Sequence, residues 1–117
     1  MTELLEKSKI AIARANLYIP FETYEKYLKN IEAVALLPHD NGILLIPLIQ
    51  ESAGGLLLKI KNLNGDRIVH AQEFFRNNGY LEEFQEKSYE VEWNSERSAL
   101  LIIDVARSEK NAETRTK

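Results

Sequence analysis

The 117-residue sequence contains no cysteine, and this absence excludes several classes of protein. Disulfide-stapled domains, thiolate metal sites and cysteine nucleophiles all need a thiol. The chain has only two histidines, His39 and His70, so one chain cannot assemble a site from several histidine ligands. We therefore expect neither a metal nor a cofactor.

Positive charge is scarce in the body of the chain. Residues 1–14 hold three of the 15 basic and two of the 18 acidic residues, and residues 106–117 hold four and two. The body between them therefore has eight basic and fourteen acidic residues, a net charge of −6. Because phosphate contacts dominate nucleic-acid affinity, an acidic body disfavours DNA binding, which would need a local basic patch.

Long hydrophobic runs are absent as well. The longest covers residues 43–49 and contains Pro47, whereas a membrane span needs about 18 to 20 apolar residues. Two glutamates interrupt the first nine residues, which do not have the pattern of a secretory signal. We expect a cytoplasmic protein without membrane contact.

The chain does contain short β-prone runs and two short helical patterns, which together predict a small, strand-rich α+β domain. A β-prone start over residues 10–19 is interrupted near residues 14–16. A proline and apolar residues at helical spacing then predict a helix over about residues 21–29. A second helix is expected over residues 72–78, ended by Gly79 in the left-handed conformation.

Three β-hairpins are predicted, because three pairs of apolar runs flank turn-forming residues. They join residues 33–37 to 43–46, 56–63 to 66–71, and 89–93 to 99–103. In the second hairpin, Asn64-Gly65 favours a two-residue type I′ turn. That turn would pair Lys59 with His70 and Lys61 with Ile68.

The order of elements repeats in two halves, about residues 8–50 and 56–104. The matched segments are residues 17–20 with 68–71, at an offset of 51, and residues 43–46 with 99–102, at an offset of 56. Two such halves can close one small barrel-like domain over residues 1–105, although an α+β chain of this size can also show such echoes by chance. Residues 106–117 have no large apolar side chain and are expected to form a disordered polar tail.

Two segments carry a family resemblance. One is a strand ending in Ile19-Pro20 before a short helix and a hairpin. The other is Gly65-Asp66-Arg67-Ile68-Val69, followed by Phe74, Phe75 and Gly79. Together they resemble the swapped-hairpin unit of the AbrB, MazE and MraZ transcription factors, over about residues 8–104. Two units in one chain are most similar to MraZ.

The resemblance implies a swapped-hairpin barrel and DNA binding through arginines on the barrel strands. Arg14 and Arg67 are the arginines near matching positions. The sequence departs from the family where Asp66 separates Gly65 from Arg67, and where Ala71 replaces the second proline. The resemblance therefore supports the fold more than it supports DNA binding.

A small basic group is expected on the second hairpin, where Lys59, Lys61 and His70 share one face and Arg67 lies near the turn. One interpretation is a patch that contacts phosphates or other anions. The other is a solvated strand face on which lysines oppose aggregation. The candidate nucleic-acid or anion contacts are Arg14, Lys59, Lys61 and Arg67.

Acidic residues cluster in the second half of the chain. They are Glu82, Glu83, Glu86, Glu90, Glu92 and Glu96. Paired carboxylates can perform acid–base chemistry or bind divalent cations, but these residues follow one another along a connection and a strand. We favour a solvated acidic face or a docking surface for a basic partner. Neither a Ser-His-Asp set nor a phosphate-binding loop is present in the sequence, and no enzyme is predicted.

These observations favour a non-catalytic binding module that acts through protein contacts, as a homo-oligomer. The alternative is a sequence-specific DNA-binding regulator of AbrB or MraZ type, with contacts from Arg14, Lys59, Lys61 and Arg67. A third interpretation is a barrel that binds a small molecule.

Overall fold

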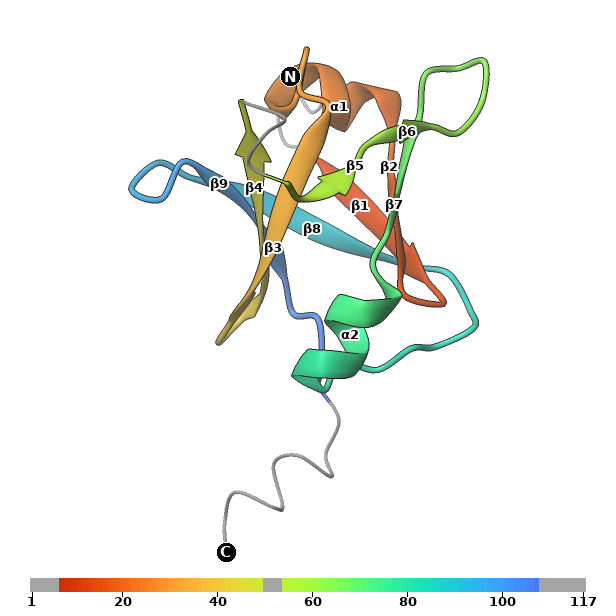
Figure 1. The fold of residues 1–117 in the computed structure, drawn as a ribbon, viewed down its shortest axis with the longest axis vertical. Helices are drawn as coiled ribbons and strands as arrows, with labels where there is room; N and C mark the ends of the chain where they lie inside the picture. The colour runs from red at the N-terminus through yellow and green to blue at the C-terminus, as the bar shows by residue number, and fades with distance from the viewer. Residues whose placement is uncertain (1–6, 50–53, 108–117) are drawn as a thin grey trace, which may run out of the picture.

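The computed structural model describes residues 7–49 and 54–107, which form one antiparallel sheet of nine strands and two helices (Figure 1). The strands are β1 (Lys9–Ala13), β2 (Asn16–Ile19), β3 (Ala33–His39), β4 (Gly42–Leu48), β5 (Leu56–Leu57), β6 (Lys59–Ile60), β7 (Arg67–His70), β8 (Lys87–Asn94) and β9 (Ala99–Ile103). Their order in the sheet is β5-β3-β4-β9-β8-β1-β2-β7-β6. The predicted strand-rich, barrel-like α+β fold is confirmed.

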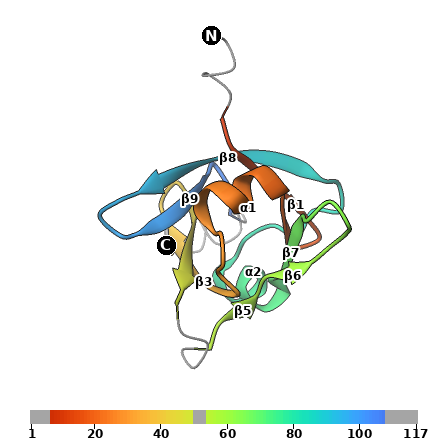
Figure 2. The same cartoon turned by 90° about the horizontal axis from the view of Figure 1, so that it is seen from above.

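The sheet curves into a nearly closed barrel because its two edge strands, β5 and β6, are consecutive in the chain (Figure 2). β5 pairs with β3 and β6 pairs with β7, so only Leu58 stands between the two ends of the sheet. Leu58 is buried, and its backbone N–H donates to the carbonyl of Glu32 at 2.9 Å. The predicted strand over residues 56–63 is therefore broken, since its two parts pair with opposite edges.

One hydrophobic core fills the barrel, and both parts of the chain contribute to it. Its fully buried members include Ile10, Leu17, Ile19, Val34, Ile43, Leu45, Val69, Phe75, Leu100 and Ile102. Along each strand these residues alternate with side chains on the outer side, as the strand period of two requires. The core therefore defines which side of each strand faces outward.

The two helices lie at opposite ends of the barrel in Figure 1. They are α1 (Phe21–Tyr27) and α2 (Gln72–Asn78). α2 has the predicted bounds, and Gly79 at its end has φ 77°, which confirms the left-handed cap. α1 ends two residues earlier than predicted: the N–H of Leu28 donates to Tyr24 as the helix cap, and Asn30 then takes a positive φ of 67°.

The connection between β6 and β7 differs from the predicted two-residue turn. A four-residue loop that begins at Asn62 joins the strands, and Lys59 pairs with Ile68 instead of His70. The side chain of Asn62 closes the loop: its Oδ1 accepts from the N–H of Asp66 at 3.3 Å, and its Nδ2 donates to Asp66 Oδ2 at 3.0 Å. Because the register shifts by two residues, Lys59, Lys61 and Ile68 stay together on one face, as predicted.

β1 and β2 form a further hairpin that the three predicted pairs do not include. Its turn residues, Arg14 and Ala15, have φ values of 53° and 61°. Positive φ at both positions is typical of a type I′ turn, which usually requires glycine or asparagine. Contacts from distant segments hold this turn. The carbonyl of Ala15 accepts from Ala71 at 3.0 Å, and the N–H of Arg14 donates to Glu83 at 2.7 Å.

Tyr80 fastens the tip of the β3–β4 hairpin to the end of α2. Its buried hydroxyl donates to the carbonyl of Gly42 at 2.7 Å and accepts from the N–H of His39 at 3.4 Å. Arg107 forms an isolated β-bridge with Tyr80, and its guanidinium carbon lies 5.0 Å from the ring centroid. The rest of the predicted tail, residues 108–117, lies outside the described residues.

Candidate functional site

Lys59 and Lys61 lie on the outer side of the barrel, as the sequence predicted. Lys59 pairs with Ile68, which alternates with the buried Val69 and therefore faces outward. The N–H of Lys61 donates to the carbonyl of Asp66 at 2.7 Å, two residue pairs further along and therefore on the same side. Both lysine side chains are exposed, so the structure brings two of the four predicted contacts together.

Arg67 does not join these lysines. It lies on the same side of β7 as the buried Val69, and its guanidinium carbon is 3.9 Å from the ring centroid of Tyr24 in α1. Its Nη1 also donates to the carbonyl of Gly65. Arg67 therefore fastens α1 to β7 through a cation–π contact.

Arg14 is separated from the lysines along β2. Asn16 pairs with His70 at one end of the strand, next to Arg14, whereas Ile19 pairs with Arg67 at the other end. With a rise of about 3.3 Å per residue, these two ends are roughly 10 Å apart. Arg14 lies beyond the Asn16 end. Lys59, in contrast, lies beside Ile68, and Lys61 lies beyond the Ile19 end. The four predicted residues therefore do not form one site.

A surface that we call the basic face covers the outer side of β1, β2, β7 and β6. It carries Lys9, Tyr18, Lys59, Lys61 and Ile68. The ammonium group of Lys61 lies 5.5 Å from the ring centroid of Tyr18. A shallow groove of about 210 Å³ crosses this face between Lys9 and Lys61.

Small residues form the floor of this groove. Ala11 pairs with Tyr18 on one side and with Ser88 on the other. Because successive residues of a strand point to opposite faces, these three side chains share the outer side. Tyr18 is the only large side chain among these three, so a hollow remains between Lys9 and Lys61.

Asp66 also lines the groove, but its carboxylate is engaged elsewhere. Oδ2 accepts from Asn62 Nδ2, and Oδ1 accepts from the backbone N–H of Phe21 at 2.8 Å. These two hydrogen bonds, with a smaller contribution from the charge of Lys61, hold the pKa of Asp66 below its ordinary value. Asp66 therefore connects the β6–β7 loop to the start of α1.

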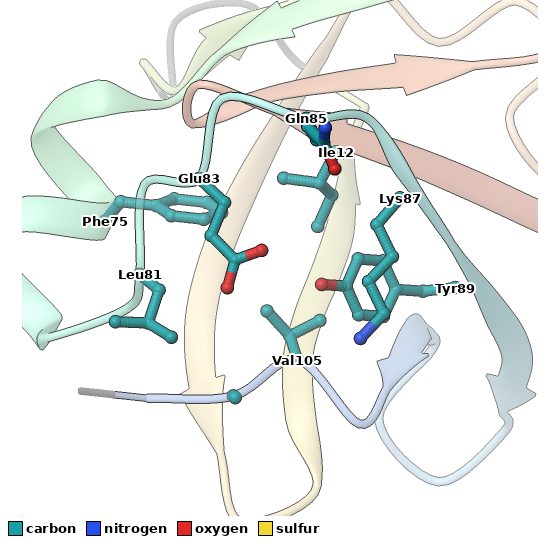
Figure 3. A pocket seen from close by; sticks show the side chains of 9 residues that line it. Ile12, Phe75, Leu81, Glu83, Gln85, Lys87, Tyr89 and Val105 are labelled. Atoms are coloured by element: carbon teal, nitrogen blue, oxygen red, sulfur yellow. The ribbon is translucent and has the colours of Figure 1, made fainter. Parts of the chain in front are cut away.

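A small cavity lies between α2, the connection that follows it and the strands β1 and β8 (Figure 3). Figure 3 shows the Glu83 carboxylate, the Tyr89 hydroxyl and the Lys87 ammonium directed toward a common space above Val105. Burial raises the pKa of Tyr89, and the negative charge of Glu83 adds to the effect. Its phenol therefore stays protonated at neutral pH.

The size of this cavity limits its chemistry. It encloses about 40 Å³, room for a few water molecules, whereas pockets for metabolites usually exceed about 300 Å³. In this conformation the cavity cannot take the ligand of a small-molecule-binding barrel. The predicted acidic cluster supplies only Glu83 to it, and the described residues contain no group of three or more possible metal ligands.

The outside of the barrel carries an apolar surface that was not predicted from the sequence. A second hydrophobic cluster contains Leu44, Ala99 and Leu101, with Ile46 and Ile103 packed against them. These residues alternate with the core residues of β4 and β9, so they lie on the outer side, where Leu44, Ala99 and Leu101 are buried and Ile46 and Ile103 are partly exposed at their border. Leu37 pairs with Leu44 and is 46% exposed. We call this set the outer apolar face.

A sequence signal for this face exists. The segments of β4 and β9 are continuous apolar runs, GILLIPL and ALLII, without the apolar–polar alternation of a strand that has one face in water. Such runs are typical of strands that are buried on both sides. These runs predicted strands, but the apolar side chains on the side away from the core were not used to predict a surface.

The comparisons with known proteins assign no family. No family model matches the chain, and no curated protein or solved structure gives a significant match. Neither helix in the described part of the chain is long and apolar enough to cross a membrane. The two surfaces of the barrel are therefore the features from which we infer a function.

Proposed function

We propose that this protein is a non-catalytic binding module that acts through protein contacts and associates with further copies of itself. The observation that carries the proposal is the outer apolar face, where Leu37, Ile46 and Ile103 reach solvent around the Leu44–Leu101 pair. Monomeric proteins rarely expose contiguous apolar patches unless the patch contacts another molecule. The strands β3, β4 and β9 contain no Asp, Glu, Lys or Arg, which favours burial of this face against protein.

Sedimentation velocity over a range of protein concentrations tests this function. We expect a mass above the 13.5 kDa of one chain, with a larger share of associated protein at higher concentration. Leu37→Asp should lower the association, because it places a charge on the outer apolar face. Phe84→Asp is the matched control, since Phe84 is 80% exposed in the connection between α2 and β8. A wild-type protein that stays monomeric at every concentration would overturn the proposal.

We further propose that the barrel consists of two halves related by an approximate two-fold axis. If β5 and β6 are counted as one broken strand, exchanging β1–β4 with β6–β9 leaves the strand order unchanged. In this exchange, residues of the first half correspond to residues of the second half at two sequence offsets. An offset of 57 relates Leu44 to its pair Leu101, and an offset of 52 relates Leu17 to its pair Val69. We use 52 in place of the offset of 51 suggested by the sequence, because 51 would match the buried Leu17 to the outward-facing Ile68.

The second candidate function is DNA binding by a regulator of AbrB or MraZ type. The interleaved order of the halves favours this candidate, because β4 pairs with β9 and β2 pairs with β7 across the axis, as a swapped-hairpin barrel would require. Lys59 and Lys61 would contact phosphates. The inward position of Arg67 and the acidic body count against it.

A gel-shift series over salt concentration tests DNA binding. Binding through phosphate contacts should weaken steeply as salt rises, and Lys59→Glu combined with Lys61→Glu should abolish it. Lys26→Glu in α1 combined with Lys29→Glu just after that helix is the control with the same change of charge. Absence of binding to a mixed-sequence duplex pool at low salt would remove this candidate.

A further inference from the structure

The two opposite sides of the barrel have complementary chemistry. β4 and β9 are neighbours on one side, and β2 and β7 are neighbours four strand positions away in the ring. In both Figure 1 and Figure 2, β3 and β9 lie on the left and β6 and β7 lie on the right. The outer apolar face and the basic face therefore point in opposite directions.

The charges bordering the outer apolar face are mainly negative. Glu92 on β8 pairs with Leu101, and Asp104 follows Ile103 at the end of β9. Both carboxylates are exposed. If this face met the same face of a second copy, carboxylates would border carboxylates, and like charges at an interface disfavour association.

The lysine edge of the basic face offers the opposite charge, although Glu86 and the hydrogen-bonded Asp66 also line the groove beside it. Lys59 and Lys61 are exposed there, so their ammonium groups are free to meet the carboxylates Glu92 and Asp104 of a facing surface. Tyr18 and Ile68 are half-buried and add apolar area between the strands. The groove along this face can accept a projecting side chain such as Leu37 from a facing surface.

We propose that the basic face of one copy docks on the outer apolar face of a second copy, with Lys59 and Lys61 near the second copy's Glu92 and Asp104. This inference rests on the proposed function and names the partner surface. Such a contact joins two different surfaces, so a bound pair of copies still has one free surface of each kind. Association then continues head to tail, into a ring or an open chain.

Mixing of two variants tests this geometry. One variant carries Leu37→Asp and Ile46→Asp, and the other carries Lys59→Glu and Lys61→Glu. Each should be monomeric alone by light scattering, because each lacks one surface. A 1:1 mixture should form a complex of two chains and stop there, since the only intact pair of surfaces is then used. The Lys26→Glu, Lys29→Glu variant should assemble as the wild type does.

Disulfide trapping supplies a second readout that does not depend on disruptive changes. The chain has no cysteine, so Leu37→Cys and Lys59→Cys introduce single exposed thiols. Mixed under mild oxidation, these two variants should cross-link to each other faster than either cross-links to itself.

The outcomes separate this inference from the proposed function. If Leu37→Cys cross-links fastest to itself, or if the lysine variant assembles as the wild type does, the head-to-tail contact is wrong and the protein-contact function stands. If the wild type never associates, both fail. If the mixture of variants stays monomeric while the wild type associates, the head-to-tail contact is again wrong.

Discussion

At the scale of single residues, Gly42 is the position with the least tolerance for a side chain. It starts β4 with φ 152°, directly beside β9. A Cβ atom at Gly42 would lie 1.8 Å from the carbonyl oxygen of Ile102. Because that oxygen belongs to the backbone of a paired strand, it cannot move aside without disturbing the sheet.

Gly42→Ala should therefore destabilise the protein by about 3 kcal/mol or more, as overpacking against a fixed backbone does. Chemical denaturation measures the change. Gly54→Ala is the control, because Gly54 also has positive φ, 82°, but nothing lies within 4 Å of its added Cβ. The free energy of unfolding of that variant should fall by only about 1 kcal/mol, because of backbone strain. Equal losses in the two variants would contradict the proposed clash.

The hydroxyl of Tyr80 is a second residue with a defined role. Tyr80→Phe removes the hydrogen bond to the carbonyl of Gly42 and leaves that carbonyl without this donor. We expect a loss of about 1 to 2 kcal/mol in the free energy of unfolding. Tyr18→Phe should cost less, because the Tyr18 hydroxyl has only a 3.4 Å contact, from Asn16 Nδ2 on the outer side. A Tyr80→Phe protein as stable as the wild type would exclude this anchoring role.

At the scale of elements, α1 is an example of a helix whose start depends on a distant segment. Its N-cap, Pro20, makes no capping hydrogen bond with its side chain. The N–H of Phe21 donates instead to Asp66, 45 residues further along the chain. The helix start and the β6–β7 loop therefore stabilise each other.

This contact predicts a dependence of stability on pH. Because the pKa of Asp66 is lower in the folded state than its ordinary 3.8, its charge stabilises the fold above that pH. The contribution is lost as pH falls through the folded-state pKa. Asp66→Asn should therefore be less stable than the wild type at pH 6, with the difference narrowing below pH 3.8. Urea unfolding at several pH values measures it, and a gap that stays constant with pH would contradict the prediction.

Several elements can be predicted from the local sequence pattern alone. The bounds of α2 and the strand character of β3, β4, β8 and β9 follow from short-range spacing and turn residues. The break at Leu58 does not, because it results from the pairing of β5 and β6 with strands far away in the sequence. The Arg14–Ala15 turn escaped prediction for a similar reason: contacts from distant residues hold a backbone that its own residues disfavour.

At the scale of the whole molecule, the halves cannot be separated without breaking strand pairs. β1 pairs with β8, β2 with β7 and β4 with β9. Each of these three strand pairs joins a strand from the first half of the chain to a strand from the second half. One continuous hydrophobic core contains residues from both halves. Folding should therefore be a single cooperative transition.

Leu17→Ala tests this cooperativity. The substitution leaves a cavity in the core near β2 and should cost about 2 to 4 kcal/mol. The unfolding midpoint followed by Trp93 fluorescence, which reports on β8, should shift by the same amount as the midpoint followed by far-ultraviolet circular dichroism. Two separate transitions would show that the halves unfold independently.

Composition and local spacing were sufficient to exclude thiol chemistry, to place two short helices and to predict a strand-rich barrel. They were also sufficient to assign Lys59 and Lys61 to one face, since the period of two in a strand survives a register shift of two residues. The inward turn of Arg67, the separation of Arg14 and the outer apolar face required the tertiary structure. Each depends on which distant strand lies alongside, and a continuous apolar run such as Ile43–Ile46 does not indicate which of its sides faces the core.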